Sequence, residues 1–101
     1  PIRQSVKTDT SVINSATNLV STRHYFVDTT VGSVTVTFPA SPSLGDTIYV
    51  SDAYGTWDTN SCIVNPNGEK INGVAGNSTL SSEYDSKEYI YIGGTAGWRT
   101  V

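Results

Sequence analysis

Residues 33–52 read SVTVTFPASPSLGDTIYVSD, and their pattern of apolar and polar side chains indicates the fold class. Residues 34–38 alternate strictly between apolar side chains and threonine, which is the period-two pattern of a half-buried strand. The residues expected to face the core are Val34, Val36 and Phe38, and those expected to face outward are Thr35 and Thr37. Pro39 ends this strand because proline cannot donate to a ladder, and 47–52 repeats the alternation after a turn.

The composition of the whole chain agrees with this local pattern. Of 101 residues, 42 are the strand-favouring Val, Ile, Thr, Tyr, Phe and Trp, and only 18 are strong helix formers. Short apolar or alternating runs recur along the chain and are separated by turns of Gly, Pro and Asn, among them Asn67-Gly68, a pair that supplies the positive φ of a tight turn. The sequence therefore predicts an all-β fold, a small antiparallel sandwich or barrel of short strands. The pattern is also compatible with a β-helical stretch within that fold.

The chain has the length of one domain, and its first part differs from the rest. Residues 1–22 are rich in Ser, Thr and Asn, whereas the strand pattern begins at residue 23. We expect an extended N-terminal arm over 1–22 and a β domain over 23–101. The arm's isolated apolar residues suit binding along a neighbouring subunit, by shallow pockets or strand addition. These predicted partner-binding residues are Ile2, Val6, Val12 and Ile13.

Charge and cysteine content exclude several classes of protein. Nine acidic and six basic residues give a net charge of −3, and the basic residues are scattered, which argues against a nucleic-acid partner. No apolar run is long enough to predict a membrane span, and no signal peptide is recognisable. A single cysteine cannot form an internal disulfide, so we expect this small β protein to gain stability by oligomerisation.

Residues that could carry chemistry have simpler interpretations as parts of the fold. Cys62 alternates with apolar residues in a strand, so we interpret it as a buried thiol and not as a nucleophile served by His24. Asp46, Asp52 and Asp58 lack the dense spacing of a calcium loop, and Asp46 follows a glycine at a turn. We therefore predict no catalytic, cofactor-binding or metal-binding residues, and no enzyme activity.

One loop carries the composition of a sugar-binding surface. Aromatic side chains flanked by Asp and Asn can stack on sugars and hydrogen-bond to them. The possible glycan contacts are Tyr54, Trp57, Asp58 and Asn60. Core filling and cross-strand pairing are the alternative interpretation for aromatic residues, and they explain the later aromatics at 89, 91 and 98 well.

The order of motifs resembles a known family. Residues 33–52 contain V-T-V-T-F-P and P-S-L-G-D, residues 63–73 read IVNPNGEKING, and the last strand ends in Gly97-Trp98. Over residues 25–101 this resembles the β-rich modules of bacteriophage virion proteins, which occur in tail-fibre and tail-appendage chains and in capsid-decoration proteins. The resemblance implies a homotrimer on the exterior of a phage particle assembled in the host cytoplasm, without catalysis.

Size and context direct the choice within that family. The fibre modules sit inside long chains, whereas here the module follows a short arm, and Pro1 is expected to be the start of a mature product. We therefore predict a capsid decoration (cement) protein that clamps neighbouring major capsid or other virion proteins. The alternative is a tail-fibre or appendage module that recognises host surface glycans.

Overall fold

The structure is a computed structural model that describes residues 7–8 and 12–101. The regular structure in these residues is β-strand throughout, so the predicted all-β class is confirmed. The strands are β1 (Lys7–Thr8), β2 (Thr17–Asn18), β3 (Arg23–Val27), β4 (Val34–Thr37), β5 (Thr47–Asp52), β6 (Cys62–Asn65), β7 (Lys70–Ile71), β8 (Val74–Ala75), β9 (Ser78–Leu80), β10 (Ser86–Tyr91) and β11 (Trp98–Thr100). No helix among the described residues is long and apolar enough to cross a membrane.

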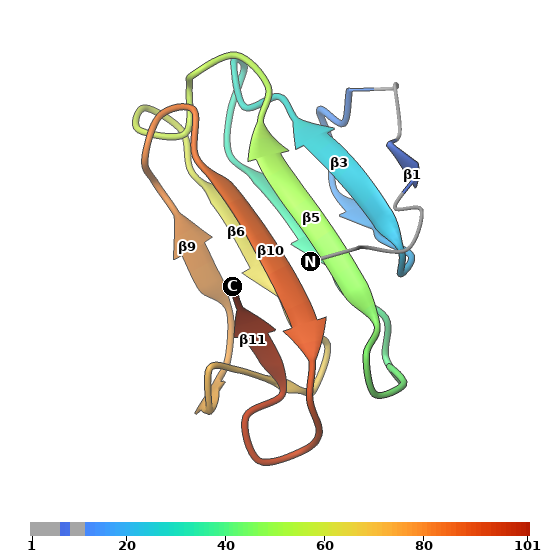
Figure 1. The fold of residues 1–101 in the computed structure, drawn as a ribbon. Helices are drawn as coiled ribbons and strands as arrows, with labels where there is room; N and C mark the ends of the chain where they lie inside the picture. Colours follow the sequence, from blue (N-terminus) through green and yellow to red (C-terminus); the bar gives the residue numbers. More distant parts are fainter. Residues whose placement is uncertain (1–6, 9–11) are drawn as a thin grey trace.

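The strands form two sheets that stack as two layers (Figure 1). The order in the larger sheet is β1-β3-β5-β10-β11-β7-β8, and the order in the smaller sheet is β2-β4-β6-β9. From β1 to β6 the chain changes sheet with every strand. Each of the first four strands pairs in parallel with the strand two positions further along, so that β1 pairs with β3, β2 with β4, β3 with β5 and β4 with β6. The first two-thirds of the chain therefore wind as a solenoid-like coil.

The predicted antiparallel arrangement is wrong for this coil. Only the later strands reverse direction: β9 runs antiparallel to β6, and β10 runs antiparallel to β5. A period-two pattern determines which face of a strand is buried, but it is the same for both strand directions. A parallel pair needs a long crossover connection, and here a strand in the opposite sheet serves as that crossover. Both sheets therefore contain parallel and antiparallel pairs. The β-helical stretch that the sequence allowed corresponds to the parallel coil.

The core lies between the two sheets. As predicted, Val34, Val36 and Phe38 are buried, while Thr35 and Thr37 are only partly covered. The facing sheet contributes buried residues with the same alternation, among them Ile48, Val50 and Tyr89.

Phe38 centres an aromatic cluster in this core. Its ring meets the rings of Tyr89 and Trp98 edge-on, with centroids 5.0 and 4.9 Å apart. Tyr91 meets Trp98 at 5.5 Å in the same manner. Such edge-to-face pairs add to the stabilisation from burial, because the positive edge of one ring meets the negative face of the next.

The Asn-Gly turn at 67–68 has the backbone geometry that the sequence predicts. Asn67 and Gly68 lie at φ 56° and 91°, the left-handed region that Asn and Gly tolerate best. The Asn67 amide also donates to the carbonyl of Phe38 at 3.1 Å. This side chain therefore ties the turn after β6 to the end of β4.

Gly97 is required by a close approach of two backbone segments. It lies at φ 72°, and a Cβ atom at this position would stand 2.0 Å from the carbonyl oxygen of Lys70. Trp98 follows it directly and is fully buried. The Gly97-Trp98 pair thus lets β11 pass against β7 while placing an indole in the core.

Much of the segment 12–22, assigned by sequence to an arm, pairs with the strands of this same chain. Ile13 forms a bridge with Val27, Thr17–Asn18 pairs with β4, and Leu19 is buried in the core. Val12 is 39% exposed. The other two predicted partner-binding residues, Ile2 and Val6, lie outside the described residues.

Candidate functional site

Cys62 is buried in the core, as its strand pattern predicts. Burial, and secondarily the negative charge of Asp52, raises the pKa of its thiol to about 12. A thiol with this pKa is protonated at neutral pH, and the thiolate is the reactive form. Cys62 therefore acts as a small apolar side chain in β6.

His24 belongs to a hydrogen-bonded group that the sequence did not indicate. Its Nε2 atom lies 2.6 Å from Ser51 Oγ, which in turn lies 2.7 Å from Ser86 Oγ. The imidazole also packs beside the tilted rings of Phe26 and Tyr49, with centroids 4.6 and 5.1 Å away, and burial lowers its pKa. Ser51 is buried whereas Ser86 is exposed, and the group links β3, β5 and β10.

The three regularly spaced aspartates have separate roles. Asp46 Oδ2 accepts the backbone N–H of Ser43 at 2.9 Å, so the predicted turn role is confirmed. Asp52 is buried and hydrogen-bonded, as described next, whereas Asp58 is exposed. In the described ranges, no three His, Cys, Asp or Glu side chains gather to hold a metal ion.

The carboxylate of Asp52 joins two loops at one end of the sandwich. It is only 5% exposed and accepts four backbone N–H groups at 2.8–3.2 Å. The donors are Gly55, Thr56, Trp57 and Tyr84. Burial alone would raise the pKa of Asp52, but these backbone donors, Tyr84 foremost, lower the pKa below its ordinary value. The ionised carboxylate is therefore the form that holds the loops.

The structure separates the four predicted glycan contacts. Tyr54 is 55% exposed and Asp58 is exposed, so both lie on the surface. Trp57 is fully buried and has no ring face on which a sugar could stack, which corrects its assignment as a contact. The Asn60 amide donates to the carbonyl of Thr29 at 2.9 Å, so this side chain holds a neighbouring loop.

Tyr84 is a surface aromatic that sequence reasoning missed. It is 69% exposed, and its N–H group is one of the donors to Asp52. Its ring occupies the space where Gly55 lacks a side chain: a Cβ atom there would lie 2.3 Å from the ring. Tyr84 thus stands beside the backbone next to Tyr54. We refer to the loops 53–60 and 81–85 together as the tyrosine rim.

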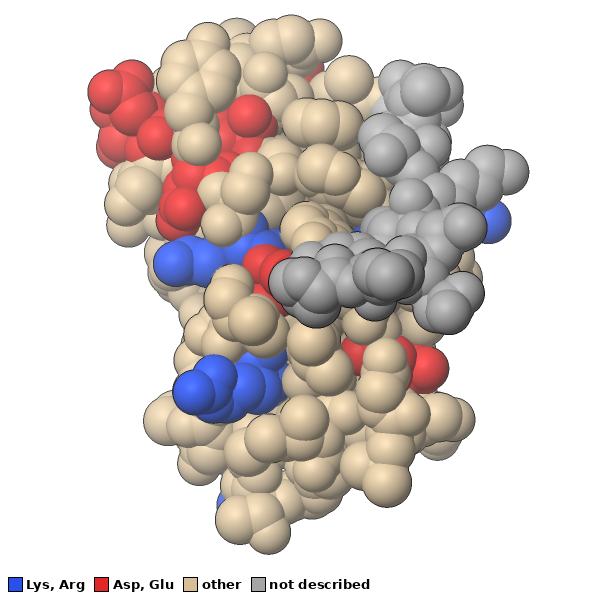
Figure 2. Space-filling view, in the orientation of Figure 1, with Lys and Arg blue, Asp and Glu red and all other residues tan. Residues whose placement is uncertain are grey.

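Negative charge collects at the same end of the molecule. Figure 2 shows the largest group of Asp and Glu side chains on this face at the upper left, where the β5–β6 and β9–β10 loops lie. Three carboxylates come from the rim itself: Asp58, Glu83 and Asp85. Lys87 forms an ion pair with Asp85 at 3.7 Å. The surface around Tyr54 and Tyr84 is therefore acidic.

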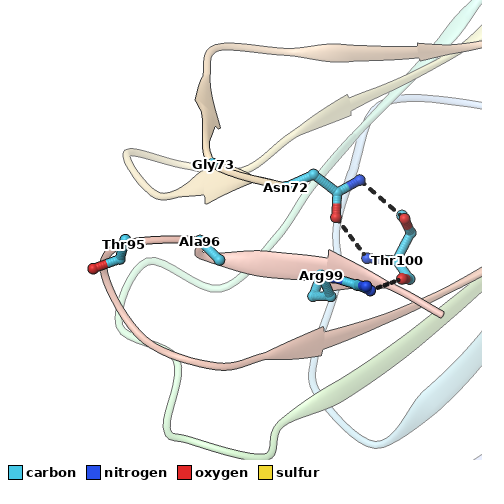
Figure 3. A pocket seen from close by; sticks show the side chains of 6 residues that line it. All are labelled: Asn72, Gly73, Thr95, Ala96, Arg99 and Thr100. Carbon is cyan, nitrogen blue, oxygen red and sulfur yellow. Dashed lines mark hydrogen bonds between the residues drawn. The ribbon is translucent and has the colours of Figure 1, made fainter.

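An open hollow of about 590 Å³ lies elsewhere, beside β7 and β11 (Figure 3). Asn72 points to Thr100 across it, donating to its hydroxyl at 2.9 Å and accepting its N–H at 3.0 Å. Arg99 donates to the carbonyl of Thr100 at 2.8 Å. Asn72, Arg99 and Thr100 thus form hydrogen bonds with one another. These bonds hold the turn after β7 against the last strand, and the hollow lies where the two segments meet.

Comparisons with other proteins add no family to these observations. A scan against known protein families and a search of curated proteins both find no match to this chain.

Proposed function

We propose that this chain is a structural component of a bacteriophage particle, a homotrimeric capsid decoration protein that clamps neighbouring coat subunits. The proposal rests on the resemblance of its motifs to phage virion modules. The supporting observation is what those motif residues do in the fold. Asn67 bonds to the end of β4, Asn72 bonds to β11, and Gly97 admits the backbone of Lys70. Each of these three residues joins segments that are distant in sequence, so this part of the resemblance concerns positions that build the architecture.

Clamping requires a surface that a neighbouring subunit can cover. Val12 is partly exposed, although Ile13 beside it is already used by the chain's own core. The coil also ends at short strands, β1 in one sheet and β2 in the other. Edge strands carry backbone groups that can accept a further strand. We therefore infer that the contact involves Val12 and the edge strands β1 and β2.

The position of the protein on a particle tests this proposal. Antibodies raised against the recombinant chain are bound to the phage particles whose genome encodes it and are located by immunogold electron microscopy. Gold distributed over the capsid shell is the expected result. Gold confined to the tail supports the appendage function instead, and particles that carry no gold, with the chain absent from their mass spectra, overturn the virion assignment.

A second candidate function is a receptor-binding module that recognises host surface glycans. One observation favours it: the exposed rings of Tyr54 and Tyr84 lie on loops that a buried carboxylate holds together. Aromatic rings present an apolar face with polar groups around it, which suits the mixed surface of a sugar.

A further inference from the structure

The tyrosine rim presents two large aromatic side chains to solvent. Tyr54 and Tyr84 are both more than half exposed, whereas Tyr25 and Tyr89 are buried and both tryptophans are fully so. Single exposed apolar residues need no explanation, but the Tyr84 ring lies against Gly55, directly beside Tyr54 in the chain, so the two exposed tyrosines belong to one part of the surface.

The two rings are held in place before any ligand arrives. Asp52 binds the backbone on both sides of the rim, at Gly55 and at Tyr84. Tyr84 also lies at φ 55°, an uncommon conformation for an aromatic residue. Backbone held in this way loses little conformational freedom on binding, so more of the contact energy appears as affinity.

The charge around the rim restricts what it can bind. Asp58 and Glu83 are exposed, and neither is in an ion pair within the described part of the chain. The one cation close by in sequence, Lys87, is paired with Asp85. Carboxylates around the rings repel an anionic sugar and attract a cationic one, and tyrosine faces attract ammonium groups directly.

We propose that the tyrosine rim binds saccharides that carry protonated amines. The ring faces of Tyr54 and Tyr84 contact the sugar and its ammonium group, and Asp58 and Glu83 supply the opposite charge. This inference rests on the glycan-binding function given above as the second candidate, and it adds the chemical class of the sugar.

Titration of the recombinant full chain with three oligosaccharides tests the inference. The probes are a tetramer of glucosamine, its N-acetylated counterpart and a tetramer of galacturonic acid, followed through the backbone amide signals in NMR spectra. The expected result is that the glucosamine tetramer binds best, shifts the amides of Tyr54, Gly55 and Tyr84, and weakens as salt is added.

Matched variants assign the binding to the rim. Tyr54→Ala and Tyr84→Ala should each weaken glucosamine binding about threefold or more, the size of an exposed cation–π contact. The double variant Asp58→Asn/Glu83→Gln should reduce the preference over the N-acetylated tetramer. Leu44→Ala, an exposed apolar residue beyond the other end of β5, should leave binding unchanged.

Different failures have different meanings. Equal or better binding of the N-acetylated or galacturonic tetramer at the rim overturns the amine preference and leaves the glycan function standing. Absence of binding by all three tetramers, or shifts located away from the rim, overturns both the inference and this use of the rim. The amide spectrum of each variant verifies folding, so a lost affinity is not mistaken for unfolding.

Discussion

At the scale of single residues, Asp52 shows how one side chain shapes a surface. It lies at the end of β5 with its carboxylate inside, where an aspartate is costly unless it is hydrogen-bonded. Four backbone N–H groups meet that requirement. One belongs to the exposed Tyr84, and another belongs to Gly55, which directly follows the exposed Tyr54. A buried acid thus determines the position of exposed aromatics.

Replacing Asp52 by asparagine should destabilise the domain by roughly 2–3 kcal/mol, because bonds to an ionised acceptor are stronger and an amide NH₂ group faces donors. Urea denaturation monitored by circular dichroism measures this loss. Asp58→Asn, at an exposed position in the loop that follows β5, is the matched control and should change stability by less than about 0.5 kcal/mol.

The ionisation of Asp52 predicts that the stability of the domain depends on pH. The pKa of Asp52 is lower in the folded state than the unfolded value of about 3.9. Its stabilising contribution is therefore complete above that value and is lost as pH falls through the folded pKa. The wild-type chain should lose more stability than Asp52→Asn on acidification below about pH 4. Parallel pH curves would show that Asp52 is not the group responsible.

Gly97 provides a test of backbone approach. Gly97→Ala should cost at least about 2 kcal/mol, because alanine is strained at this φ and its Cβ would overlap the Lys70 carbonyl. Gly94→Ala is the control, since a Cβ there meets nothing within 4 Å. Thermal melts of the two variants should differ clearly, and equal melting temperatures would contradict the close approach of β11 and β7.

At the scale of elements, β4 has one face in the core and one outside. Phe38→Ala just after this strand should cost roughly 3–5 kcal/mol, since it empties the centre of the aromatic cluster. Thr37→Ala, on the opposite face, should cost less than about 0.5 kcal/mol. Denaturant melts compare the two, and a loss below about 1 kcal/mol for Phe38→Ala would mean that the cluster contributes little.

Substitutions in the segment 12–22 test where the folded domain begins. Leu19 is buried and Val20 beside it is 52% exposed. If 12–22 is part of the folded unit, Leu19→Ala should cost roughly 2–4 kcal/mol and Val20→Ala much less. Equal, small effects in urea melts would support an arm separable at residue 22 instead.

At the scale of the whole molecule, the proposed assembly is a trimer. Sedimentation equilibrium at micromolar concentration should show a species of three times the 10.8 kDa chain mass. Val12→Asp should shift this toward the monomer, because it places a charge in the proposed contact. Val31→Asp is the control, as Val31 is 99% exposed in a loop outside that contact. A wild-type monomer, alone and on virions, would refute the trimer.

The features that could be predicted from the sequence are local: the all-β class, the buried face of β4, the Asn67-Gly68 turn and the buried thiol of Cys62. These follow from side-chain alternation and backbone preference within a few residues, so they can be read without knowing the fold. Strand direction, the burial of Trp57 and the approach of the Tyr84 ring to Gly55 could be learned only from the tertiary structure. Each depends on which distant segment becomes a neighbour, and neither alternation nor composition differs between the possible neighbours.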